Sequence, residues 1–329
     1  VLNRVAAGNP SDIQGQLSSN GQVFLINPNG ILFGAGSQVN TGSFTASTLD
    51  LTDQNYLNRD YRFSLGSGSK SASIVNQGSL SAATQGYIAL LAPQVRNEGV
   101  ISATLGTVAL GAGDQVSLHI HGDKLISMTV SNASLNALVE NRLAVRAPGG
   151  QVILSARAAN ALLQGVVNNT GIIEARSTSD LLGHTAGGHI SLDAAMVTNS
   201  GVLDASGTGV GQSGGKIDVS GGFIGLGGSI SADGQVQGGN INAAAQGTLS
   251  LAQTVSAQGL AGKGGTIRYT AGGQIVETST SVSDASGRVD GGAIRAHADG
   301  GVVSSGHYRA DGLQGAGGRV DISGAGVRL

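Results

Sequence analysis

GGKIDVSGGFIGLGGSISADGQVQ, residues 214–237, runs directly into GGNINAAAQGTLSLAQTVSAQGLAGK, residues 238–263, and the two stretches follow one plan. Each begins with a glycine pair and divides into three short segments separated by glycine. The second glycine of the pair recurs at positions 150, 188, 215, 239, 265, 292 and 318, so the later steps are all about 26 residues. Three short strands with turns in every period predict a parallel β-helix, whose coils stack through strand hydrogen bonds.

The segments after the glycine pairs alternate apolar and polar residues with a period of two, as strands do. Ile217, Ile241 and Ile267 hold the same place in successive periods, and we expect them to stack in one file inside the helix. The polar positions between the aliphatic residues predict an outward row made of Asp218, Asn242, Arg268, Arg295 and Asp321. Glycine suits the corners because it tolerates positive φ and close backbone approach.

The composition supports many small layers over a single large core. Of 329 residues, 56 are glycine, while aromatic residues make up 3% and charged residues 12%. The formal net charge of −2 gives no reason to expect a nucleic-acid partner. No apolar run is long enough for a membrane-spanning helix. Cysteine is absent, which excludes disulfides and suits a chain that stays extensible before it folds elsewhere.

A second repeat has the form Asn-x-Gly-x-(aliphatic or Phe)-x-Ala. It begins at Asn40, Asn76, Asn97, Asn169 and Asn199. We place these asparagines at corners of the coils. Two roles stay open for them: an internal ladder of amide hydrogen bonds along one column, or separate turns that each asparagine caps by itself.

Two stretches interrupt the repeats, residues 49–70 and residues 104–148, and both predict excursions from the helix. Within the second, Val116–Ile120 and Leu125–Val130 alternate around a connection that contains glycine, which predicts a hairpin. A short helix is expected over residues 135–141. The predicted fold is thus all-β: a parallel β-helix with about three strands per coil and one or two hairpins outside it.

The residues that could carry chemistry do not converge, so we expect no enzyme, no metal and no cofactor. His119, His121 and Asp123 alternate on the hairpin and could approach a metal, but a solvent-facing hairpin explains them better. Aspartates recur near the third-strand corners at Asp204, Asp233, Asp284 and Asp311. Because they alternate between the positions before and after an alanine, we expect them not to share a face and to cap corners instead.

The N-terminal half carries a family resemblance. GQVFLINPNGILFGAGSQVNTGSFTASTLDL, residues 21–51, resembles the filamentous haemagglutinin N-terminal domain, the secretion domain of TpsA-type exoproteins of two-partner secretion. The most specific part is the string Asn27-Pro28-Asn29-Gly30-Ile31. The resemblance continues through GYIALLAPQVRNEGVISA, GTVALGAGDQVSL and LVENR to GGQVILSARAANALLQGVVNNTGIIEA, and it leans towards the high-molecular-weight adhesin branch.

The resemblance implies a right-handed β-helix and a division of the chain into a secretion domain over residues 1–176, N-terminally truncated, and a repeat stalk over residues 177–329. It also implies a large adhesin, secreted or held at the surface of a Gram-negative bacterium, that crosses the periplasm. An outer-membrane TpsB-type β-barrel transporter with POTRA domains would recognise it. By the same resemblance Asn27, Pro28, Asn29, Gly30 and Ile31 form the secretion motif, with Pro28 and Asn29 at the centre of a tight turn.

Two other functions fit the same sequence. The chain could be the carrier region of a haemolysin or contact-dependent toxin of the same secretion class, or, less well, a β-helical enzyme that acts on polysaccharides. A lyase would need several acidic residues and a basic residue on one face, which the sequence does not supply. We expect a monomer that binds no nucleic acid and does not span a membrane. Its further partners would be a receptor or a glycan on a host cell or a neighbouring cell.

Overall fold

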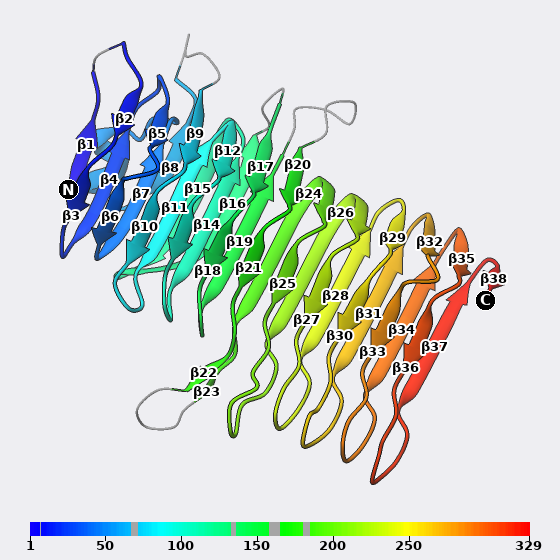
Figure 1. Ribbon diagram of the computed structural model, residues 1–329. Coiled ribbons are helices and arrows are strands. Elements are labelled where there is room, and N and C mark those ends of the chain that lie inside the picture. Colours follow the sequence, from blue (N-terminus) through cyan, green and yellow to red (C-terminus); the bar gives the residue numbers. More distant parts are fainter. Residues whose placement is uncertain (7, 67–71, 133–135, 158–164, 180–184) are drawn as a thin grey trace. The chain divides into compact units, whose positions relative to one another are not determined.

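The computed structural model describes residues 1–6, 8–66, 72–132, 136–157, 165–179 and 185–329. Nearly all of the regular secondary structure in these residues is strand (Figure 1). It divides into two compact units: unit 1 is Val1–Ala147 with Val152–Gly171, and unit 2 is Pro148–Gln151 with Ile172–Leu329. In each unit parallel strands stack into three columns, and each coil adds one strand to every column. The predicted parallel β-helix with about three strands per coil is confirmed.

Unit 1 contains the earlier coils. Its first column is β1 (Leu2–Arg4), β4 (Gln22–Ile26), β7 (Ser43–Ser47), β11 (Tyr87–Ala92), β14 (Thr107–Ala112) and β19 (Gln151–Ala156). Its second column is β2 (Ser11–Ile13), β5 (Ile31–Phe33), β9 (Ser73–Asn76), β12 (Gln94–Asn97), β17 (Leu138–Asn141) and β20 (Val166–Asn169). Its third column is β3 (Gln16–Ser18), β6 (Gln38–Thr41), β10 (Ser79–Ala82), β13 (Val100–Ser102) and β18 (Ala144–Arg146).

Unit 2 repeats this plan with longer corner loops. Its first column is β24 (His189–Asn199), β26 (Lys216–Leu226), β28 (Asn240–Ala245), β31 (Thr266–Ala271), β34 (Ala293–Ala298) and β37 (Arg319–Gly324). The second column continues from the last residues of β26 through β29 (Leu249–Leu251), β32 (Gln274–Glu277), β35 (Gly301–Ser304) and β38 (Val327–Arg328). The third column is β21 (Ile172–Glu174), β25 (Val202–Asp204), β27 (Ser229–Ser231), β30 (Thr254–Ser256), β33 (Val282–Asp284) and β36 (His307–Arg309). A small hairpin, β22 (Thr178–Ser179) with β23 (Thr185–Ala186), leaves this unit.

The stacking register in unit 2 is the one that the sequence predicts. Ile217 pairs with Ile241, and Ile241 pairs with Ile267, so the three side chains form one buried file. The polar positions between them also follow one another from coil to coil and face outward. Burial of aliphatic side chains therefore repeats in every coil, and each coil buries the apolar edge of its neighbour.

The second glycine of each pair marks a place where two coils touch through their backbones. A Cβ on Gly239 would lie 2.2 Å from the carbonyl oxygen of Gly215, and one on Gly265 would lie 2.2 Å from that of Gly239. The same carbonyl oxygens accept the strand-opening bonds from Asn240 and Thr266, at 3.0 and 2.9 Å. Glycine recurs here because the coil spacing leaves no room for a side chain, and not because φ is positive.

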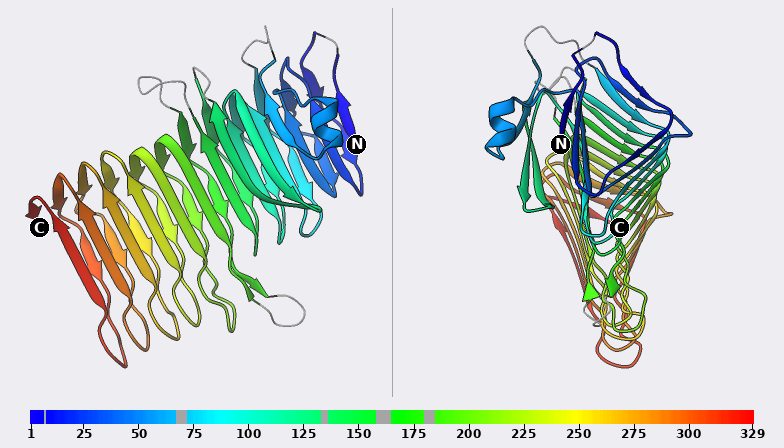
Figure 2. Two further views of the ribbon diagram at one scale, coloured as in Figure 1. Left: turned by 180° about the vertical axis from the view of Figure 1, so that it is seen from behind. Right: turned by 90° about the vertical axis from the view of Figure 1, so that its left-hand side faces the viewer.

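The two excursions from unit 1 meet in an antiparallel sheet of their own. β15 (Gln115–His121) pairs with β16 (Lys124–Asn132), which confirms the predicted hairpin, and β15 also pairs with β8 (Tyr61–Ser64) from the first excursion. Helix α1 (Asp53–Leu57), capped by Thr52, precedes β8 and was not predicted. Figure 2 shows the helix and the hairpin on one side of the coils.

The helix expected over residues 135–141 is wrong for the residues that the structure describes. Residue 135 lies outside them, and Leu138–Asn141 is strand β17. This segment pairs in register with β12, which buries Val139 and Asn141 completely. Pairing with the neighbouring coil therefore makes this segment a strand.

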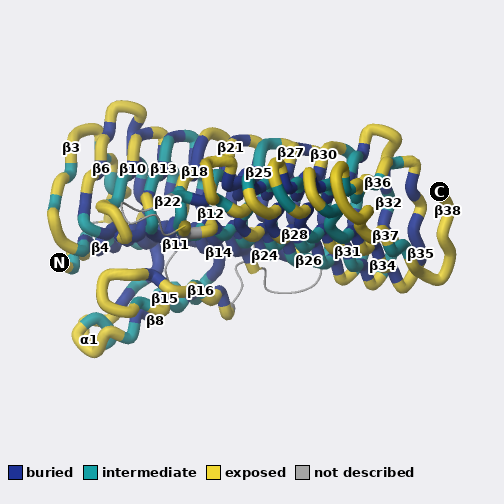
Figure 3. Tube along the Cα trace, turned by 90° about the horizontal axis from the view of Figure 1, so that it is seen from below, coloured by how far each residue is buried: buried dark blue, intermediate teal, exposed yellow. Residues whose placement is uncertain are grey.

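The excursion sheet lies against the outer face of the first column (Figure 3). It covers an apolar patch there. Outward side chains such as Phe24, Tyr87 and Leu91 pack there with Phe63 and Leu118 from the sheet, and all are buried. YIALLA in β11 and TVALGA in β14 lack alternation because both of their faces are covered. Unit 1 thus has a second core, outside its coils.

Candidate export site and asparagine column

The resemblance places the secretion motif at a tight turn between β4 and β5. The amide of Gly30 donates to the carbonyl of Asn27 at 3.2 Å, so Pro28 and Asn29 occupy the two central positions. Proline is favoured at the first of these because its φ is already fixed. Gly30 has a φ of +117°, a conformation that side chains rarely adopt. The strand then resumes at Ile31, whose side chain is buried.

Asn27 fixes this turn from inside. Its side chain is fully buried and donates to the carbonyl of Asn9 at 3.0 Å and to Ser11 Oγ at 2.9 Å. Its Oδ1 accepts the amide of Asn29 at 2.9 Å. Its own amide donates to the carbonyl of Ser47 in the following coil at 2.9 Å. The turn is therefore held between two coils, while Pro28 is half-buried and Asn29 is exposed at the apex.

A buried column of asparagines runs along the second column of unit 1. Asn76, Asn97, Asn141 and Asn169 are all 0% exposed and in register. The Nδ2 groups of the first three donate to the Oδ1 of the next asparagine at 2.8, 2.8 and 2.7 Å. The Oδ1 of Asn76 and of Asn97 also accepts the amide of Gly78 and Gly99. Both roles left open by the sequence are therefore filled at once.

The column differs from the predicted set at two positions. Asn40 lies in a third-column strand, is exposed and pairs with Ser81, so it does not belong to the column. Asn141 does belong, although Arg142 and Leu143 follow it in place of the x-Gly pattern. Asn199 is buried in unit 2, where it lies opposite Leu226 and donates to the carbonyl of Gly201 at 3.4 Å.

An ion network covers the outer face next to the column. Glu140 Oε2 accepts from Arg96 at 2.8 Å and from Arg142 at 3.1 Å, and Arg142 also reaches Glu98 at 3.0 Å. Burial alone would raise the pKa of Glu140. The hydrogen bonds from Arg142 and Arg96 outweigh burial and hold this pKa below its ordinary value.

We expect acid to weaken unit 1 through Glu140. A carboxylate whose pKa is lowered by folding adds stability above its unfolded pKa of about 4.5, and this stability is lost as the pH falls through the lower folded value. Thermal unfolding between pH 7 and pH 3 should show a fall in midpoint below about pH 5 that Glu140→Gln reduces. Asp12→Asn, an exposed carboxylate outside the network, is the control. A pH profile unchanged by Glu140→Gln would contradict the assignment.

The aspartates of unit 2 do share a face, so that expectation was wrong. Asp204 and Asp284 lie before the alanine of their coils, and Asp233 and Asp311 lie after it. Positions two residues apart on a strand point to the same side, here outward. Corner capping is confirmed for three of the four: the amides of Ser206, Gln258 and Ser286 donate to Asp204, Asp233 and Asp284 at 2.9, 2.7 and 2.8 Å.

The hairpin histidines are exposed on β15. Asp123 Oδ1 accepts the side-chain amide of Gln22 at 2.8 Å, which ties the hairpin tip to β4. Among the residues that the structure describes, no group of three or more His, Cys, Asp or Glu side chains could hold a metal ion. In the same part of the chain, no helix has the length and apolar character needed to cross a membrane.

Comparison with protein families identifies the class of protein. The family model for the TPS secretion domain matches residues 1–203. TPS secretion domains belong to exoproteins that a dedicated TpsB transporter exports in two-partner secretion. Because the match covers more than half of the sequence, the chain belongs to the TPS secretion domain family, and its destination is extracellular.

Individual relatives agree with this family. A heme/hemopexin-binding protein of Haemophilus influenzae is 30% identical over 187 residues, which cover 55% of this chain and 20% of the relative. A second Haemophilus influenzae heme/hemopexin-binding protein is 26% identical over 201 residues. The crystal structure of the HMW1 secretion domain from Haemophilus influenzae matches with a TM-score of 0.71 and 28% identity over 99% of this chain and 81% of that one. The chain spans about a fifth of the length of the two heme/hemopexin-binding proteins.

Proposed function

We propose that the Asn27–Gly30 turn is part of the surface that the partner transporter recognises, through POTRA domains in the periplasm of a Gram-negative bacterium. The observation that carries this proposal is the different burial of the two asparagines in the turn. Asn27 is buried and bonded to two coils, whereas Asn29 is exposed at the apex. Asn29 Nδ2 also donates to Asn27 Oδ1 at 3.1 Å, so the turn holds this side chain in place at its exposed apex.

Export would draw on the coil-by-coil fold. Each coil offers backbone groups to the next one, as when the carbonyl of Ser47 accepts the amide of Asn27. Folding can therefore proceed in sequence as the chain emerges outside the cell, and every new coil buries the apolar edge of the last. Such vectorial folding supplies a drive for export without ATP.

We further propose that the coils of unit 2 begin the stalk of a non-enzymatic adhesin, secreted or held at the cell surface. Support comes from Asp204, Asp233 and Asp284 of this unit, whose carboxylates accept capping bonds from backbone amides. The relatives point the same way, since they are a secretion domain and binding proteins by name. A capped aspartate is poorly placed to serve as an acid or base in catalysis.

Export of two turn variants tests the proposal. The chain and its partner transporter are co-expressed, and the amount in the medium is measured. Asn29→Ala should reduce export by about tenfold or more while the purified chain keeps its thermal midpoint, because an exposed contact is lost. Asn27→Ala should reduce both export and the thermal midpoint, because the buried partners of this side chain lose their hydrogen bonds.

Asn40→Ala, an exposed asparagine of the same coil, is the matched control and should be exported normally. Unchanged export of Asn29→Ala would refute a recognition role for the turn. A parallel loss of export and thermal midpoint in Asn29→Ala would assign the motif to folding instead.

A further inference from the structure

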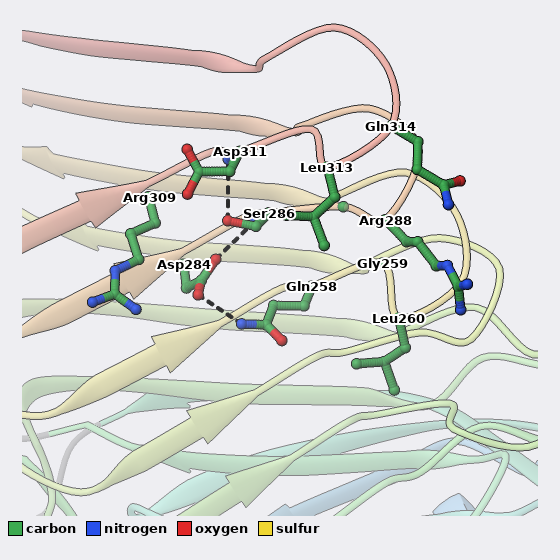
Figure 4. Close-up of a pocket in the computed structure, with 11 residues that line it drawn as sticks. Gln258, Gly259, Leu260, Asp284, Ser286, Arg288, Arg309, Asp311, Leu313 and Gln314 are labelled. Atoms are coloured by element: carbon green, nitrogen blue, oxygen red, sulfur yellow. Dashed lines mark hydrogen bonds between the residues drawn. The ribbon is translucent and has the colours of Figure 1, made fainter.

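A groove of about 630 Å³ lies on the outer face of unit 2, between the ends of third-column strands and the corner loops that follow them. Asp284 and Arg309 line it from the strand side, and Leu260, Arg288 and Gln314 line it from the loop side (Figure 4). It lies outside the family match, which ends at residue 203. Its volume is that of a small-ligand site.

The groove follows from the repeat. In each coil an alanine separates two outward residues, and a corner loop then folds away from the strand. The loops are held in register by bridges between Gly259 and Gly287 and between Gly287 and Gly312. The amide of Leu313 donates to the carbonyl of Gly287 at 3.1 Å. The loop wall is therefore as regular as the strand wall, and the groove runs from coil to coil.

The floor of the groove is fixed by its own hydrogen bonds. Asp284 is buried; its carboxylate accepts from Gln258 Nε2 at 2.6 Å and from the amide of Ser286 at 2.8 Å. Ser286 Oγ accepts the amide of Asp311 at 3.1 Å. These bonds span three successive coils, so the floor is preorganised and needs no rearrangement to receive a ligand.

The groups at the rim are not used by the fold. Arg288 and Arg309 are exposed, and within the described residues neither forms an ion pair. Other arginines of this unit do form one: Arg176 meets Asp204 at 2.6 Å, and Arg319 meets Asp321 at 2.7 Å. The side chains of Leu260 and Leu313 are also left open, at 44% and 78% exposure.

We propose that this groove binds an acidic oligosaccharide built of uronate sugars. Guanidinium groups bind carboxylates with two parallel hydrogen bonds, which suits Arg288 and Arg309. Asp311 and Gln314 can exchange hydrogen bonds with sugar hydroxyls. Leu260 and Leu313 offer apolar contact to the faces of the rings. Only a ligand with carboxylates, hydroxyls and apolar ring faces uses the whole lining.

The periodicity of the groove fits a sugar chain that runs along it. Arg288 and Arg309 lie in successive coils, which are separated by about 4.8 Å, close to the advance of one ring in an extended glycan. They stand on opposite walls, as carboxylates do on alternate sides of an extended uronate chain. Polyphosphate has no hydroxyl donors, so its phosphates would face the Asp311 carboxylate without a compensating hydrogen bond.

The test is calorimetric titration of the purified 329-residue chain with tetragalacturonate and with its fully methyl-esterified form. The acid form should bind and the ester should bind at least about tenfold more weakly, since it lacks the carboxylates. Arg288→Gln and Arg309→Gln should each weaken binding by about tenfold. Arg268→Gln removes an exposed guanidinium from the outward row of the first column and should change binding less than about twofold.

Three results would overturn the site: no binding of tetragalacturonate, equal binding of acid and ester, or an equal loss in Arg268→Gln, which would mean general charge attraction. The idea that the groove holds the ligand of an adhesin rests on the proposed function. The titration itself does not depend on export. Arg309→Gln should be exported normally. Failed titration with normal export therefore removes only the groove, and the turn variants test the export role separately.

Discussion

Gly239→Ala should destabilise unit 2 by about 3 kcal/mol, because the new methyl group has no place between the coils. Its Cβ would lie 2.2 Å from the carbonyl oxygen of Gly215 and 3.0 Å from the Cβ of Ala232. The nearer contact is backbone, and it accepts the bond that opens the next strand, from Asn240. Relief requires the coils to separate, and that breaks strand pairing on both sides.

The measurement is local, since stacked coils need not unfold in one step. Amide hydrogen exchange should accelerate in β26, β28 and β31, and the urea midpoint should fall. Gly227→Ala is the matched control: its nearest contact is ordinary, 3.8 Å from the carbonyl oxygen of Asn199, and its φ is not in the left-handed region. Equal behaviour of the two variants would show that the glycine column is not what sets the coil spacing.

The same glycine column explains why so much of unit 2 could be predicted. A position where only glycine fits recurs once per coil, so the sequence carries the register of the whole stack in its glycine spacing. Ile217, Ile241 and Ile267 then fall into one file without further information. Their pairing is between neighbouring coils, and a repeat of about 26 residues makes such contacts visible in the sequence.

The asparagine column was predicted less well, because the chain turns similar corners at different columns. Asn-x-Gly marks a sharp turn wherever it occurs, and local sequence does not say which column the strand belongs to. Asn40 sits at a third-column corner, and Asn141 occupies the true column without the glycine. The excursion sheet was harder still to predict. Its strands β8 and β15 pair with each other, although most of two coils separate them in the sequence. Only the lack of alternation in β11 and β14 indicated that something covers them.

Asn97→Ala should cost unit 1 about 4 kcal/mol, since it breaks the asparagine column at its centre. The variant leaves the donor of Asn76 and the acceptor of Asn141 without their partner, inside a completely buried column. It also removes the bonds from Nδ2 to the carbonyls of Gly99 and Ala144, both at 3.1 Å. Unsatisfied buried polar groups cost more than the hydrogen bonds themselves contribute, and a cavity is added.

The check is the urea midpoint together with hydrogen exchange in β9, β12 and β17. Asn40→Ala removes an asparagine from the same sequence motif at an exposed position and should change stability by less than about 0.5 kcal/mol. The double variant Asn76→Ala with Asn97→Ala should cost less than the two single variants added together, because Asn76→Ala removes the donor that Asn97→Ala alone leaves unpaired. Strict additivity would mean that these side chains act as separate turn caps. In that event the column would be a coincidence of register, and the amide ladder would contribute nothing to the stability of unit 1.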